Sequence, residues 1–425
     1  MEIENILADL IRIQTVNPPG DETEVARYLK RLFDEHNIPN EIIEPSPGRG
    51  SFIAHLGEGE KSLLFISHTD VVTVSEGWNF APFSGEIKDG FVHGRGALDC
   101  KGLVAAEACA VIQLAHHANF RGRLIFAATA DEETGGKLGV RYLIENCLDK
   151  IKADFAINEG GRPPLRIGDK TCRFLQTGEK GPAWVRLRTR GLSAHGSLPT
   201  LGDNAVVKMA EAIKILAAHQ PKITLIPEVK QLVQTIAELQ GFYGEVNEEN
   251  VYQIIKGVED KTFAAYLTSI TRMTVSPNAV SGGTKTNIVP DACEAEMDIR
   301  VLPGQDERYI FEELGRISGE VEMEMMQYQA PTFSTSDSEP YRLVTDSLRE
   351  FFGDDVILPC ISAGATDSRF LREAGIPSYG IDMITMNLDP EMIKSVHGKN
   401  EKIDIESLRL KSDFLARVAM RYLGG

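Results

Sequence analysis

Apolar residues in the first third of the chain follow two different periods. From residue 3 to about residue 36 they recur every three or four positions, and Asn17–Gly20 interrupts the run, which predicts helix, turn and helix. Four apolar strings of strand length follow, and an Ala-rich stretch between the second and third is predicted to be helical. The strings are Phe52–Leu56, Leu63–Ser67, Leu124–Thr129 and Asp154–Ile157, and the helix is Leu103–Ala118. Because the last three strings contain few polar residues, they are typical of a mostly parallel sheet that is covered on both faces.

A second pattern begins near residue 178. Ala183–Arg190 alternates apolar and charged side chains, as a strand with one face in water does. The stretch from about 222 to 280 shows no pattern that assigns it. Two helices, Asn204–His219 and Glu307–Ile317, and two further alternating strands, Ala292–Val301 and Val321–Gln327, are expected around it. These elements predict a small antiparallel sheet with helices on one face.

The pattern of the first third of the chain returns after Pro331. Tyr341–Phe352 and Ile405–Tyr422 have helical spacing, and the Gly-containing loop Ser362–Asp367 lies between them. A chain of 425 residues is too long for one ordinary core, so two domains are expected. We predict a discontinuous α/β domain formed by residues 1–178 and 331–425, with an α+β domain at residues 179–330 inserted into it.

Composition and charge exclude several classes of partner. With 42% hydrophobic and 25% charged residues the chain is typical of a globular protein. Its net charge of −17 repels nucleic acid and anionic membrane surfaces, so neither is expected as a partner. The six cysteines are scattered singly, and the first residues lack the basic and apolar regions of a signal peptide. We therefore expect reduced thiols and a cytoplasmic location.

Acidic residues and a histidine follow the apolar strings. His68 and Asp70 come after the second string, Glu132 and Glu133 after the third, and Glu159 after the fourth. Because the carboxyl ends of parallel strands meet at one edge of a sheet, these side chains are expected to share a crevice. The start of the long helix can bring one more acid, Asp99, to the same edge.

Each of these residues alone has an ordinary structural explanation, such as a satisfied histidine, a solvated turn or a helix cap. Together they form the ligand set of zinc and similar ions, and one carboxylate can bridge two ions that lie about 3.5–4 Å apart. Asp99, Glu133 and Glu159 contribute three negative charges that would repel one another without cations. The sequence therefore predicts a pair of divalent ions.

Two other interpretations fail on spacing. Gly94–Asp99 begins like a dinucleotide-binding loop but has Asp where the third Gly or Ala belongs. Gly191–His195 has His where a serine hydrolase's nucleophile elbow requires Gly. The remaining histidines are expected to be structural or solvent-facing; these are His36, His55, His93, His116, His117 and His219.

With these strings in place, the chain resembles the zinc metallopeptidase and deacylase family that includes aminoacylase-1, acetylornithine deacetylase, succinyl-diaminopimelate desuccinylase and carboxypeptidase G. Five strings occur in the family's order, namely Ser67–Val71, Gly94–Gly102, Asp131–Gly136, Asn158–Gly161 and Ser395–Gly398 around His397. Three strings of the inserted domain also match, namely Gly191–His195, Thr286–Pro290 and Asp298–Gly304. The resemblance covers nearly the whole chain and is thinnest over residues 222–280. It implies a catalytic α/β domain and an inserted lid domain that pairs two copies into a homodimer.

The resemblance also implies roles for the acids and histidines. His68, Asp99 and Glu159 would hold one ion, and Asp99, Glu133 and His397 would hold the other. Zinc is the expected ion, with cobalt and manganese as alternatives. Asp70 would orient His68 by accepting its second N–H, and Glu132 would be the general base for the attacking water. A cis peptide bond is implied between Asp99 and Cys100.

Four further residues are implied to contact the substrate. His195 would stabilise the oxyanion, Asn287 would make polar contacts and Arg300 would pair with a free carboxylate of the substrate. Gly364 is also implied to bind substrate. From the residues alone, His195 would be a turn histidine and Arg300 a surface residue of a strand. Only the resemblance favours substrate-binding roles for them. Whether His195 serves its own subunit's site or its partner's stays open.

The function that follows is hydrolysis of an amide bond next to a free carboxylate, in a short peptide or an N-acyl amino acid. Carboxypeptidases, dipeptidases and aminoacylases are of this type, and Ala365–Arg369 together with the long lid favours them. A narrow deacetylase or desuccinylase of amino-acid biosynthesis is an alternative, and so is a non-catalytic, metal-dependent binder of amino-acid-like ligands. Glu132 favours an enzyme, because a binding protein needs ligands but no base.

Overall fold

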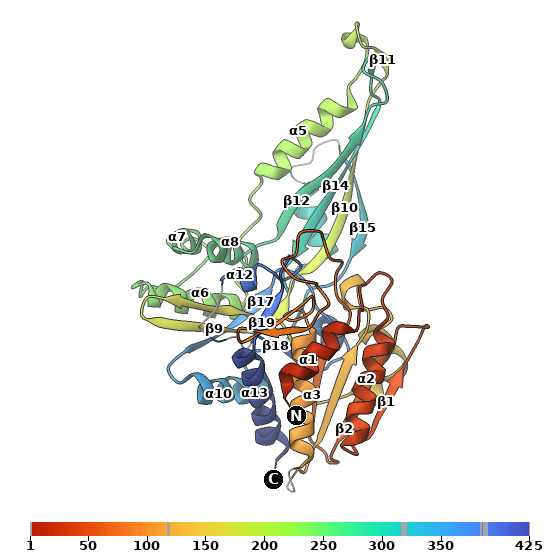
Figure 1. Cartoon of the computed structure of the whole chain (residues 1–425). Coiled ribbons are helices and arrows are strands. Elements are labelled where there is room, and N and C mark those ends of the chain that lie inside the picture. The colour runs from red at the N-terminus through yellow and green to blue at the C-terminus, as the bar shows by residue number, and fades with distance from the viewer. Residues whose placement is uncertain (1, 117–119, 316–320, 383–384, 386–389, 425) are drawn as a thin grey trace. The chain divides into compact units, whose positions relative to one another are not determined.

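The computed structural model describes residues 2–116, 120–315, 321–382, 385 and 390–424 (Figure 1). His117 and the ends of the two helices predicted to reach residues 118 and 317 lie outside these ranges. The chain divides into two compact units. Unit 1 is Met1–Thr177, Ser334–Cys360 and Thr366–Gly425; unit 2 is Gly178–Phe333 and Ile361–Ala365. The short segment 361–365 therefore groups with the inserted part of the chain, whereas the sequence assigned it to the α/β domain.

The large sheet has a parallel centre and antiparallel edges. Its strands lie in the order β1-β2-β6-β3-β7-β18-β9, and β6, β3, β7 and β18 are parallel to their neighbours in this group. Their bounds are β1 Asn40–Ile43, β2 Ser51–Leu56, β3 Ser62–His68, β6 Arg123–Thr129, β7 Phe155–Glu159, β9 Lys170–Glu179 and β18 Ser378–Ile381. Strands β8 (Arg162–Ile167) and β17 (Val356–Ser362) also pair with β9. All seven residues of β3 are buried, which explains its continuous apolar sequence.

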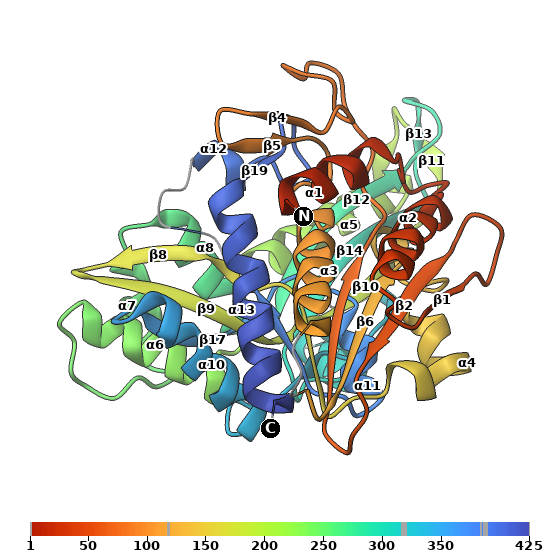
Figure 2. The ribbon, with the colours of Figure 1, turned by 60° about the horizontal axis from the view of Figure 1, so that its bottom comes forward.

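Helices cover both faces of this sheet. One face and its core carry α1 (Ile3–Arg12), α2 (Glu22–Glu35), α3 (Lys101–Ala115), α10 (Glu339–Phe352) and α13 (Ile405–Leu423). The other face carries α4 (Val140–Ile151) and α11 (Ser368–Glu373). Helix α3 is buried almost all round because it packs against the sheet, α1 and α13, and Figure 2 shows α3 and α13 side by side. This packing is why α3 has no polar face.

A three-stranded sheet joins two loops that are distant in sequence. It contains β4 (Glu86–Lys88), β5 (Phe91–His93) and β19 (Lys402–Asp404), and Lys402 pairs with His93. Helix α12 (Pro390–Ile393) lies in the chain before β19. Because β5 precedes Asp99 and β19 follows His397, this pairing brings those two loops together.

Unit 2 contains the antiparallel sheet that the alternating segments predicted. Its order is β12-β14-β10-β15, with every neighbouring pair antiparallel. The strands are β10 Gly181–Arg190, β12 Thr274–Gly282, β14 Ala292–Val301 and β15 Glu322–Tyr328, and helices α5 (Ala205–Ala218) and α9 (Glu307–Gly315) share their core. The stretch that the sequence left unassigned forms α6 (Pro227–Leu239), α7 (Val251–Lys256), α8 (Lys261–Ile270) and the first part of β12.

Short elements complete unit 2. Strand β11 (Ala194–His195) pairs with β13 (Ile288–Val289), η2 (Pro199–Leu201) follows β11, and β16 (Thr332–Phe333) pairs with the last two residues of β9. Among the helices that the structure describes, none is both long and apolar enough to cross a membrane.

Candidate metal centre

The predicted ligands lie together at the carboxyl edge of the parallel strands of unit 1. His68 is the last residue of β3 and Glu159 the last of β7. Glu133 lies in the short helix η1 (Glu132–Thr134) that follows β6. Asp99 stands two residues before α3, and His397 lies in the loop before β19. The His68, Glu133 and Glu159 segments converge because parallel strands end at one edge, and the pairing of β5 with β19 brings the Asp99 and His397 loops together.

Asp99 is shared between the two histidines. The Nε2 atom of His68 lies 3.0 Å from Asp99 Oδ1 and 3.5 Å from Glu159 Oε1. The Nε2 atom of His397 lies 2.9 Å from Asp99 Oδ2 and 3.3 Å from Glu133 Oε2. One carboxylate therefore directs a separate oxygen to each cluster, which is the arrangement that a bridging ligand of two ions requires.

The donor set fits divalent ions. Donor atoms of His68, Asp99 and Glu133 all lie within 4.8 Å of one another. The Oε1 atom of Glu133 is buried and has no hydrogen-bond partner in the described part of the chain. Buried carboxylate oxygens normally have a partner, and imidazole with carboxylate is a donor set that suits zinc. These residues can therefore hold the two ions that the sequence predicts.

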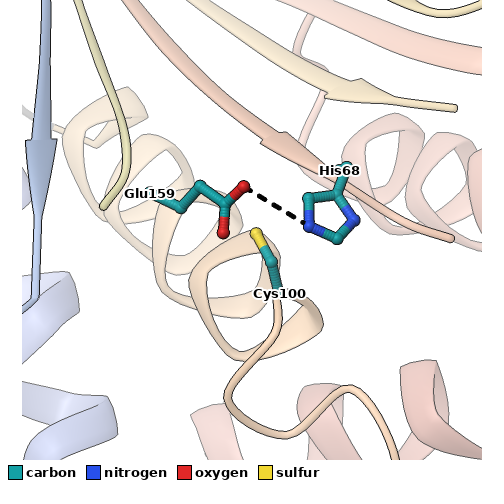
Figure 3. Close-up of side chains that lie close together, drawn as sticks. All are labelled: His68, Cys100 and Glu159. Atoms are coloured by element: carbon teal, nitrogen blue, oxygen red, sulfur yellow. Dashed lines mark ion pairs between the residues drawn. The ribbon is translucent and has the colours of Figure 1, made fainter. Parts of the chain in front are cut away.

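Cys100 also lies at this site, which the sequence did not indicate. Figure 3 shows His68, Cys100 and Glu159 pointing toward one another, and their donor atoms lie within 4.8 Å. Burial raises the pKa of the Cys100 thiol to about 12, so the thiol is protonated when no metal is bound. The Asp99–Cys100 peptide bond is cis, as the resemblance implied.

The surrounding carboxylates hold both histidines in the protonated state when no metal is bound. Burial pulls the pKa of His68 down, but the charge of Glu159 and the hydrogen bonds to Asp70 and Asp99 raise it well above its usual value. Hydrogen bonds to Asp99 and Glu133 raise the pKa of His397 to about 10. Burial would raise the pKa of Asp99, yet the two histidines lower it. Because a metal ligand must be a neutral imidazole, binding of ions here releases protons.

Asp70 connects His68 to the turn that carries Glu132 and Glu133. Its carboxylate accepts main-chain N–H bonds from Glu132 at 3.1 Å and Glu133 at 3.0 Å, and a side-chain bond from Asn17 at 2.9 Å. The Nδ1 atom of His68 lies 3.0 Å from the main-chain oxygen of Asp70 and 3.5 Å from its Oδ1. The main-chain oxygen is thus the nearer acceptor, since three other donors already engage the carboxylate.

Two acids without metal-ligand geometry face the same site: Glu132, which is partly buried, and Asp367, which is buried. Burial raises the pKa of Glu132 well above its usual value, and the charges of Glu159 and Asp367 add to the shift while His68 opposes it. Burial also raises the pKa of Asp367, to about 7. One Asp367 oxygen lies 3.4 Å from the Thr129 hydroxyl, and the other has no partner within the described residues. Glu132 was predicted here, whereas Asp367 was not.

A buried ion pair, which sequence reasoning missed, holds the Asp99 loop against the His397 loop. Glu401 accepts bonds from Arg95 Nη1 at 2.6 Å and from the main-chain N–H of Asp99 at 3.0 Å. It also accepts from the N–H groups of Gly96 and Leu98. Arg95 in turn donates to the main-chain oxygen next to His397, that of Gly398, at 2.7 Å. Glu401 is therefore a positioning residue for Asp99, and only its place four residues after His397 could have indicated it.

The four predicted substrate contacts all belong to unit 2. His195 lies in β11, with Nδ1 2.7 Å from Ser197 Oγ, and Asn287 directly precedes β13. Arg300 in β14 donates from Nε and Nη2 to the two Asp298 oxygens, at 2.8 and 3.0 Å. Gly364 donates its N–H to Ser362 Oγ at 3.0 Å. Their roles toward substrate stay predictions.

An α/β sheet whose parallel edge gathers histidines and carboxylates in two groups is typical of metal-dependent hydrolases. A family model described as peptidase family M20/M25/M40 matches residues 64–421, and the chain belongs to that family. This confirms the resemblance drawn from the sequence motifs and the α/β fold with its mostly parallel central sheet.

Relatives of known name agree with this assignment. The probable succinyl-diaminopimelate desuccinylase of Staphylococcus aureus (strain MRSA252) is 27% identical over 385 residues, which are 87% of this chain and 86% of that protein. Aminoacylase-1 of Sus scrofa is 27% identical over 407 residues, 92% of this chain and 88% of that protein. An M20 family metallo-carboxypeptidase of Sulfolobus solfataricus superposes with a TM-score of 0.71 at 20% identity, covering 99% of this chain and 100% of that one. The chain is a metal-dependent hydrolase that acts on amide bonds.

Proposed function

We propose that the protein uses two divalent ions to cleave an amide bond next to a free carboxylate, in a short peptide or an N-acyl amino acid. The position of Asp99 between the two histidine clusters carries this proposal. His68, Asp99 and Glu159 would hold one ion, and Asp99, Glu133 and His397 the other. Zinc suits this set of nitrogen and oxygen donors best, with cobalt and manganese as alternatives.

The ions would polarise the amide carbonyl and acidify the attacking water. They would also offset the negative charges of Glu159 and Asp367, which add to the effect of burial on the pKa of Glu132. Glu132 then accepts a proton from the water whose oxygen attacks the amide carbon. When the C–N bond breaks, Glu132 returns that proton to the nitrogen of the leaving amine. The N–H bonds from η1 to Asp70 fix the turn, so the base stays in place during both transfers.

Four residues of unit 2 are proposed to contact the substrate. His195 would donate to the oxyanion, and Asn287 and Gly364 would make polar contacts to substrate. Arg300 would pair with the substrate carboxylate, for which it must share or exchange the Asp298 carboxylate that it now contacts. The non-catalytic binder is disfavoured because Glu132 is a partly buried acid beside the ligands with no ligand role of its own.

Substrate recognition by Arg300 can be measured with one pair of substrates. In the wild type, amidation of the substrate's free carboxylate should lower kcat/KM by at least about tenfold, since a paired charge is lost. An Arg300→Met variant should show little further loss on amidation, because the pairing is already gone. An Arg188→Met variant, which removes a partly exposed arginine of β10, is the control. Equal losses in the wild type and Arg300→Met would exclude this role.

The surface of unit 2 supports a homodimer. Strand β12 is at an edge of its sheet, with β14 on one side and no other strand among the described residues. Val280 on this strand and Val207 and Ile215 on α5 are about half exposed or more. Exposed apolar side chains beside an open strand edge are typical of a surface that pairs with a second copy.

Mixed dimers would show whether His195 acts in the partner's site. His195→Ala and Glu132→Gln chains should each be nearly inactive alone. If they are unfolded and refolded together, half the dimers are hybrids with one intact site in two, so about a quarter of wild-type activity should return. Light scattering establishes the dimer independently. A mixture that stays inactive although it is dimeric would place His195 in its own subunit's site.

A cytoplasmic location is part of the proposal. Six cysteines without disulfides suit a reducing compartment, and the net charge of −17 suits small substrates rather than nucleic acid or membranes.

A further inference from the structure

The side chain of Asn158 holds the end of the strand that carries Glu159. Strand β7 pairs with β3 only as far as Ile157, so Glu159 lies beyond the last of these pairs. Asn158 Oδ1 accepts the main-chain N–H of Glu159 at 2.7 Å. Figure 3 shows the Glu159 carboxylate directed toward His68. The position of this metal ligand therefore depends on how firmly the Asn158 amide is fixed.

Ser368, the first residue of α11, fixes the Asn158 amide. Its Oγ atom accepts a hydrogen bond from Asn158 Nδ2 at 3.0 Å and another from Ser378 Oγ at 2.9 Å. All three side chains are buried, with at most 1% exposed. A hydroxyl oxygen has two acceptor lone pairs, so these two donors use both of them. Because the bonds are buried, loss of the hydroxyl would leave two donors without an acceptor and without water to replace it.

The far end of this chain of bonds is anchored in strand β18, the parallel neighbour of β7. Ser378 is the first residue of β18. Its main-chain N–H donates to Ser334 Oγ at 2.9 Å, and its main-chain oxygen accepts from Arg372 Nη2 at 2.9 Å. The bonds thus run from a fixed strand through Ser368 to the main chain of Glu159.

We propose that Ser368 is a positioning residue for Glu159 and acts through Asn158. It sets the place from which the Glu159 carboxylate reaches the ion that it shares with His68, which we call the first ion. This inference rests on the two-ion centre of the proposed function. Removing a partner that orients a metal ligand typically lowers metal affinity by about 10–100-fold. None of these bonds involves a ligand of the ion assigned to His397, so only the first ion should be affected.

The test measures zinc binding by calorimetric titration in a His397→Ala background, which leaves mainly the first ion. Adding Ser368→Ala removes the shared acceptor and should weaken the binding of that ion by about tenfold or more. Ser368→Thr keeps the hydroxyl and should restore most of the affinity. In the otherwise unchanged protein, Ser368→Ala should weaken one of the two binding events and leave the other within about twofold. Ser347→Ala is the matched control and should change neither affinity, because it removes an equally buried serine hydroxyl that bonds to Leu343 in α10.

A second comparison separates positioning from a general loss of stability. In an Asn158→Ala background the path from Ser368 to Glu159 is already broken, so Ser368→Ala should lower the zinc affinity no further. Ser368→Cys keeps the approximate size of the side chain but supplies only a weak acceptor, so it gives the same comparison if the alanine variant does not fold. Additive losses of affinity, equal losses for both ions, or unchanged binding in a folded Ser368 variant that lacks the hydroxyl would each overturn the inference.

Metal binding and hydrolysis are measured separately, so the inference and the proposed function can fail independently. Two bound ions with this dependence on Ser368, but without amide hydrolysis, would support the positioning role and reject the function. Amide hydrolysis by a protein whose zinc affinity does not depend on Ser368 would overturn the positioning role and leave the function in place.

Discussion

Replacing Glu132 by glutamine should lower kcat by roughly 10²–10⁴-fold while both ions remain bound. Glutamine keeps the shape of the side chain but cannot accept a proton from water. The substitution removes no metal ligand. It also keeps the main-chain N–H bond from residue 132 to Asp70, so the turn that carries Glu133 stays in place. Steady-state kinetics and elemental analysis on the same preparation measure the two effects together.

The matched control is Glu145→Gln, an identical change at an exposed residue of α4 whose carboxylate pairs with Arg141. It should change neither kcat nor the metal content. Unchanged turnover in Glu132→Gln would assign the base to another acid. Asp367 would then be the first candidate, because its pKa is also raised by burial, to about 7.

The sequence predicted most elements of unit 1 because burial leaves a visible pattern there. Strand β3 is buried on both faces, so Leu63–Ser67 reads as a continuous apolar string. The helices at residues 227–270 have no such signature. Helix α7 has six residues, and short helices depend on tertiary packing more than on their own sequence. The Asp260 side chain that caps α8 was a usable signal.

The ligands of the candidate site were predictable, but the residues that support them were not. His68 and Glu159 could be placed because strand ends are visible in the sequence and parallel strands share an edge. Arg95 and Glu401 are charged residues that look solvent-exposed in a sequence. They are buried by contacts between segments far apart in the chain, such as the pairing of β5 with β19. No local sequence pattern indicates such contacts.

Replacing Asp99 by alanine should remove both ions, whereas replacing His397 should remove mainly one. In the proposed arrangement Asp99 is the only ligand common to the two sites, so its loss leaves each ion with only two protein ligands. Loss of His397 leaves the ion at His68, Asp99 and Glu159 with its full set. After reconstitution with zinc, elemental analysis should give about two ions per wild-type chain, about one for His397→Ala and well below one for Asp99→Ala.

The metal-free fold should survive both changes, because Glu401 and Arg95 hold the Asp99 loop through main-chain atoms and not through the Asp99 side chain. Thermal unfolding in the presence of a chelator checks this. Fewer than about one ion in the wild type would contradict the two-ion proposal, and one tightly held ion in Asp99→Ala would contradict the bridging role. Retention of an ion in Asp99→Ala would have a physical cause. Loss of the Asp99 carboxylate removes a contact that raises the pKa of both His397 and His68. The variant's histidines would be neutral at lower pH and better able to bind metal, so loss of both ions despite that gain would be strong support for the bridge.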